Sequence, residues 1–268
     1  MNAEESRLSR RSFLTTAGGM ALGVGIAGLP GTADAVNADV PALPWPYPPE
    51  GLDAEAVSQN AYNLYYAGGG CGHGSAQSII DALAQKLPEP WGRLPVGMYR
   101  YGAGGAVGWG TICGALNGVL GVMDILNAHN ALGNALIDYF CTTELPTDAW
   151  NDGDTFVTSV SYSPLCHNSV SRWAAAAGVP VKDSSKSERC ARLVGDIVFK
   201  AVNLMNEYFR TTDRVVPPAW VPPASYATCY NCHTQVDMIP SQQGKMDCLA
   251  CHDVAPAHGS WRKRKGKG

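Results

Sequence analysis

Charged residues are scarce in this sequence: they make up 16% of its 268 residues, well below the roughly 25% of an average soluble chain. Five of the cations lie in the last seven residues, so the rest of the chain is net acidic and lacks the basic surface that nucleic-acid binding needs. Long apolar runs are also missing. The run near the N-terminus is diluted by glycine and threonine and is too short and weak for a membrane span. We therefore expect neither a nucleic-acid partner nor a membrane span.

Apolar residues, at 46%, are sufficient for a substantial core, and the chain also has nine cysteines and six histidines. That number of thiols and imidazoles is more than a helical core requires. It directs attention to metal, haem or redox chemistry.

The N-terminus has the pattern of an export signal. Arg10 and Arg11 precede the mild apolar run, and Ala33 and Ala35 form a small-x-small cleavage site. Paired arginines in this position are typical of a twin-arginine signal; a general secretory signal that happens to carry two arginines is the alternative. We predict a signal peptide over residues 1–35 and a periplasmic location.

The mature chain divides into three parts. A Pro-rich leader over 36–52 cannot be helical. A helical body over 53–212 follows, and a tail over 213–268 begins with a second Pro-rich stretch. Capping residues and apolar periodicity predict helices in the body and one short strand. The predicted helices cover 53–67, 75–87, 111–140, 169–177 and 188–210, and the strand covers 155–162.

The tail contains two copies of the attachment motif for c-type haem, CxxCH. In each copy two thiols add to the porphyrin vinyl groups, and the following imidazole binds the iron. The predicted attachment thiols are Cys229, Cys232, Cys248 and Cys251, and the predicted axial ligands are His233 and His252. Two CxxC pairs at this separation also fit a zinc ribbon. A ribbon gives no reason for a histidine after both pairs, so two haem c groups are favoured.

Each haem iron needs a sixth ligand from elsewhere in the chain or from another subunit. The remaining histidines are His73, His129, His167 and His258. Four spare histidines for two positions favour bis-histidine over histidine–methionine ligation. We rank His129 and His167 ahead of His73 and His258.

Five cysteines remain in the body: Cys71, Cys113, Cys141, Cys166 and Cys190. Disulfides are reasonable outside the cytoplasm, but an odd count leaves one thiol over. The alternative is an iron–sulfur or redox site on four of them, with Cys141 as the bystander. The predicted helices place these four near helix N-termini, where the helix dipole is expected to stabilise thiolates.

A glycine-rich loop over 102–110 leads into a Cys-Gly-Ala helix at Cys113. This segment resembles the C_GCAxxG_C_C redox-protein family, although Ser75 stands where that family has a cysteine and Cys71 lies one turn earlier. Together with the haem motifs, the body is similar to the split-Soret cytochromes c of sulfate-reducing bacteria. The resemblance implies a homodimer with two bis-histidine haems per subunit and an iron–sulfur site.

We therefore predict a mainly α protein, with a helical body and an irregular C-terminal di-haem segment, that transfers electrons among periplasmic redox partners. An electron carrier is favoured over an enzyme. In the enzyme alternative, one haem keeps an open sixth position and reduces a small oxyanion or a peroxide. A zinc-ribbon structural module is the third alternative.

Overall fold

The first helix of the body, α3 (Ala54–Leu64), begins where the sequence predicts. The Asp53 side chain caps it, since its Oδ1 accepts a hydrogen bond of 3.0 Å from the Ala56 amide. These elements belong to a computed structural model that describes residues 41–147, 149–150, 156–210, 212–233 and 244–251. The predicted signal peptide lies outside the described residues.

The glycines after α3 do not stop the helical path, as the sequence suggests, but kink it. A π turn, η1 (Tyr65–Gly69), joins α3 to α4 (Gly70–Lys86). Gly68 has a φ of 88° there, which glycine adopts at no steric cost. The second helix therefore starts five residues before the predicted 75 and includes Cys71 and His73.

The predicted helix over 111–140 is two helices, α6 (Gly114–Ile125) and α7 (His129–Thr142). Asn127 interrupts them with a φ of 53°, in the left-handed region that asparagine tolerates better than most residues. The apolar spacing is continuous across the break because both helices bury their apolar side chains in the same core.

The remaining regular elements of the body follow the predictions with shifted ends. Helix α8 (Cys166–Ala177) begins at Cys166 rather than at 169, and Gly178 ends it with left-handed φ and ψ. Helix α9 (Ser185–Phe209) begins at Ser185 rather than at 188. The strand predicted over 155–162 is only β2 (Ser159–Val160), which pairs antiparallel with β1 (Glu144–Leu145).

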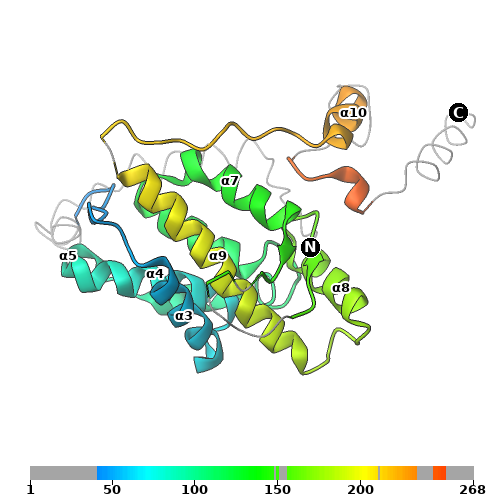
Figure 1. Cartoon of the computed structure of the whole chain (residues 1–268), viewed down its shortest axis with the longest axis horizontal. Helices are drawn as coiled ribbons and strands as arrows, with labels where there is room; N and C mark the ends of the chain where they lie inside the picture. The colour runs from blue at the N-terminus through cyan, green and yellow to red at the C-terminus, as the bar shows by residue number, and fades with distance from the viewer. Residues whose placement is uncertain (1–40, 148, 151–155, 211, 234–243, 252–268) are drawn as a thin grey trace, which may run out of the picture. The chain divides into compact units, whose positions relative to one another are not determined.

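Packing within the body buries α4 against α6 and α3 against α9 (Figure 1). Two short helices, α5 (Pro88–Trp91) and η2 (Val96–Gly102), follow α4. In the tail, the segment predicted to be irregular contains α10 (Ala224–His233) and a 3-10 turn, η3 (Cys248–Ala250). The fold is mainly α, as predicted.

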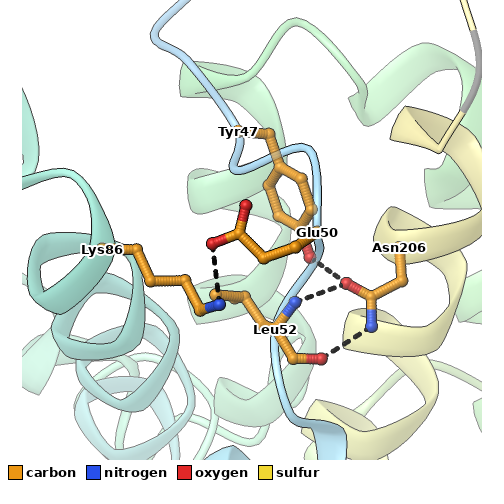
Figure 2. A network of polar contacts seen from close by, with 5 residues as sticks. All are labelled: Tyr47, Glu50, Leu52, Lys86 and Asn206. Atoms are coloured by element: carbon orange, nitrogen blue, oxygen red, sulfur yellow. Dashed lines mark hydrogen bonds and ion pairs between the residues drawn. The ribbon is translucent and has the colours of Figure 1, made fainter.

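The Pro-rich leader is extended, as predicted, and it is bound to the body. Trp45 is buried and meets Trp91 edge to face, with ring centroids 5.1 Å apart. Asn206 on α9 fixes the chain further along: its Oδ1 accepts hydrogen bonds from the Tyr47 hydroxyl at 2.6 Å and the Leu52 amide at 2.8 Å. Its Nδ2 donates to the Leu52 carbonyl at 2.8 Å (Figure 2).

Replacing Asn206 by Ala is expected to lower the free energy of unfolding by about 2–3 kcal/mol, because three hydrogen bonds are lost and the partners Tyr47 and Leu52 lose their pairing. The matched control is Asn203→Ala on the same helix. Asn203 is exposed, and its only printed bond is to the Phe199 carbonyl within α9, so its loss should change stability by less than about 0.5 kcal/mol. Denaturant unfolding of both variants measures the difference. Equal stabilities would contradict the role given to Asn206.

Candidate functional site

Cys113 and Cys166 are brought together by a small piece of antiparallel backbone. Ile112 and Leu165 form an isolated β-bridge. On either side of it, the Cys113 amide donates to the Pro164 carbonyl at 2.8 Å and the Cys166 amide donates to the Thr111 carbonyl at 2.7 Å. The bridge therefore places the start of α6 beside the start of α8.

Cys71 reaches the same place because α4 and α6 cross at glycines. A Cβ added to Gly114 would lie 2.9 Å from the Cys71 Cβ and 2.8 Å from the Gly72 nitrogen, closer than real side chains come. The missing side chain at Gly114 is thus what allows Cys71 to lie against the first turn of α6.

Cys190 completes the group from α9. The Cys71 thiol donates a hydrogen bond to the Cys190 sulfur, and Cys113 and Cys166 interact electrostatically with the pair. Cys141 is not in this group; its charged neighbour is Asp138. The structure therefore gathers the four cysteines that the sequence singled out, and the described cysteines are all free thiols. We call Cys71, Cys113, Cys166 and Cys190 the thiol group.

Burial, rather than the helix dipole, dominates the chemistry of three of these thiols. It raises the pKa of Cys113 to about 12 and raises the pKa of Cys166. The pKa of Cys71 is raised because its proton is held between two sulfurs. The expected thiolate stabilisation is seen only at Cys190. Its pKa is lowered to about 6 by the hydrogen bond from Cys71 and by the Arg189 guanidinium. Cys190 lies in the second turn of α9, not the first.

The thiol group is not arranged around a single metal ion. In the described part of the chain, no three His, Cys, Asp or Glu side chains lie close enough to bind one. A polynuclear iron–sulfur cluster separates its cysteines more widely than one ion does, because inorganic sulfides lie between the iron atoms. Four buried, free thiols beside a buried cation fit such a cluster in number, chemistry and charge.

The haem motifs lie on α10 and η3. In α10, Cys229, Cys232 and His233 fall three and four residues apart, so a helical backbone projects all three toward one side. That is the arrangement needed for two thiols and an imidazole to meet one porphyrin. Cys248 lies next to Cys229. His252 and His258 lie outside the described residues.

Helix α8 contacts the second haem motif. Asn168 donates through Nδ2 to the Cys251 sulfur at 3.2 Å, and Arg172 donates to the Ala250 carbonyl at 3.3 Å. Cys166 of the thiol group lies two residues from Asn168. Sequence reasoning missed both contacts, because nothing in the spacing of α8 relates it to the tail.

The spare histidines have different surroundings. His73 is buried in α4, and His167 is exposed in the first turn of α8. His129 begins α7, with its Nδ1 2.8 Å from Asp124 Oδ1. It lines a surface hollow of about 390 Å³ together with Gly133. A carboxylate at Nδ1 leaves Nε2 as the atom that can bind iron, and it fixes the imidazole orientation.

Comparison with known proteins agrees with this site. Residues 74–204 match the family described as "Putative redox-active protein (C_GCAxxG_C_C)". The chain is 31% identical over 272 residues to the split-Soret cytochrome c of Desulfovibrio desulfuricans, covering 93% of this chain and 96% of that protein. This chain belongs to the split-Soret cytochrome c family.

The fold comparison extends over most of both chains. A solved structure described as "A novel iron centre in the split-Soret cytochrome c from Desulfovibrio desulfuricans ATCC 27774" matches with a TM-score of 0.69 at 31% identity. The match covers 80% of this chain and 92% of the other. As a split-Soret cytochrome c, the chain is a redox protein of the c-type cytochrome class. None of its described helices is long and apolar enough to cross a membrane.

Proposed function

We propose that this split-Soret cytochrome c is a periplasmic electron-transfer protein with two covalent haem c groups and one iron–sulfur centre. The observation that carries the proposal is the convergence of Cys71, Cys113, Cys166 and Cys190 in a chain that also has two CxxCH motifs. When bound, haem and iron–sulfur groups each take up and release one electron at a time.

The residues divide between attachment and ligation. Cys229 and Cys232 would hold one haem and Cys248 and Cys251 the other, with His233 and His252 as the proximal iron ligands. The thiol group would ligate the iron–sulfur centre. Its burial excludes water, and the low pKa of Cys190 supplies a thiolate at neutral pH.

The periplasmic location rests on the paired arginines and cleavage site of residues 1–35. The relative's name and title, split-Soret cytochrome c and iron centre, agree with a chain that combines haem with a second iron site. We also propose a homodimer, as the family resemblance implies, which light scattering of the purified protein can check.

The experiment that tests the proposal is the intact mass of protein from the periplasmic fraction. We expect the mature polypeptide plus two haems, about 1.2 kDa. Cys251→Ala should leave at most one firmly attached haem, because the second motif then offers a single thioether. A mass equal to the bare polypeptide, or zinc in place of haem, would refute the haem assignment and favour a zinc ribbon.

His129 is the residue we propose first as a sixth ligand, because Asp124 orients its imidazole and a hollow adjoins it. His129→Ala should convert one haem from low spin to high spin without detaching it, since the thioethers persist. Visible and paramagnetic resonance spectra measure the change. His167→Ala is the parallel test at the exposed histidine. If His129→Ala leaves both haems low-spin, His129 is not a ligand.

A further inference from the structure

Arg189 is a cation buried in the body of the protein. Only 1% of its surface is exposed, and a buried charge is costly unless opposite charge and hydrogen bonds surround it. One nitrogen, Nη2, donates to the Ser169 hydroxyl at 2.7 Å. Its Nε is buried and has no hydrogen-bond partner among the described residues. The side chain is therefore fixed at one end and unsatisfied at the other.

The groups around Arg189 do not supply a carboxylate for it. The adjacent Glu188 accepts hydrogen bonds from Tyr62, Tyr66 and Arg192 instead. Ser169, its printed partner, lies one turn after Cys166 on α8. The guanidinium acts electrostatically on Cys113, Cys166 and Cys190. A buried positive charge with an unpaired N–H thus lies beside the thiol group.

We propose that Arg189 is the positioning residue that neutralises the iron–sulfur centre and raises its reduction potential, an inference that rests on the proposed function. A cluster held by four thiolates is an anion, and reduction adds one electron and one further negative charge. A fixed cation stabilises the reduced form more than the oxidised form. The Nε–H, unpaired in the protein alone, is the donor available to a cluster or cysteine sulfur.

The low dielectric of the site makes this charge effective. Coulomb energy falls with distance and with the effective dielectric constant, which is far lower at a buried position than in water. Arg192 provides the contrast on the same helix. It is a second guanidinium, but its Nε donates to Glu188 at 2.6 Å, so its charge is already balanced by a carboxylate.

The test is a redox titration of the whole, haem-loaded protein, followed by paramagnetic resonance of the iron–sulfur centre. Arg189→Met removes the charge and keeps most of the side-chain volume. At a fixed applied potential it should lower the ratio of reduced to oxidised centre about tenfold, which corresponds to 59 mV for one electron. Arg189→Lys should keep most of the wild-type ratio, and Arg192→Met should leave it unchanged. The haem potentials serve as an internal reference.

Each result decides the proposal. An unchanged potential in Arg189→Met, or equal shifts in the Met and Lys variants, would overturn it. If Arg189→Met does not fold, Ser169→Ala decides: it keeps the charge but releases Nη2, so a smaller shift in the same direction is expected, and no shift would overturn the proposal. Failure of the proposed function is seen separately, as wild-type protein without acid-labile sulfide.

Discussion

A Cys113→Ser protein is expected to lose the iron and acid-labile sulfide that exceed its haem iron, while both haems remain attached. Serine keeps the size of the side chain but is a poor ligand for iron in a cluster. Cys113 is 2% exposed and lies within the thiol group, so no solvent molecule or nearby side chain can replace it easily. Iron and sulfide analysis of anaerobically purified protein gives the measurement.

Cys141→Ser is the matched control for that experiment. Burial raises the pKa of Cys141 to about 12, as it does at Cys113, so the two thiols start from similar states. Only Cys113 interacts with the other cysteines. Sulfide lost equally from both variants, or retained by Cys113→Ser, would show that the thiol group does not hold the centre.

Gly118→Ala is expected to lower the free energy of unfolding by about 3 kcal/mol, the upper range for overpacking. An added Cβ would overlap the Ser75 hydroxyl and the Gly72 carbonyl and lie 3.1 Å from the Ala76 nitrogen. Two of these three atoms are backbone, so α4 and α6 must separate to make room. Thermal and denaturant unfolding measure the loss.

Gly97→Ala provides the comparison, because a Cβ at Gly97 has no atom within 4 Å. It should change stability by less than about 0.5 kcal/mol. If the Gly118 and Gly97 variants unfold alike, the close helix crossing does not contribute as described.

Local sequence signals predicted the ends of several helices well. Asp53 and Gly178 act through their own backbone or nearest turn, so their effect is independent of the rest of the chain. The break at Asn127 was missed because apolar periodicity reports burial, and burial continues across it. The kink at Gly68 was read as a stop, since a glycine that ends a helix and one that bends it look the same in sequence.

The membership of the thiol group was predictable, but its chemistry was not. Spacing and family resemblance singled out the four cysteines, whereas the opposite pKa shifts of Cys71 and Cys190 depend on a contact between α4 and α9. Arg189 was missed for the same reason. Beside a capping sequence it reads as one of several surface charges of a helix start, and only packing against α8 reveals its burial.

The glycine crossing of α4 and α6 has a consequence for how this sequence can drift over evolutionary time. Gly72, Gly114 and Gly118 set the separation of the helices through backbone contact. The position of Cys71 relative to Cys113 therefore does not depend on which apolar side chains fill the surrounding core. Leucine, valine and isoleucine can exchange there at modest cost, while these glycines cannot gain even a methyl group. The redox site can thus outlast extensive change in the core that surrounds it.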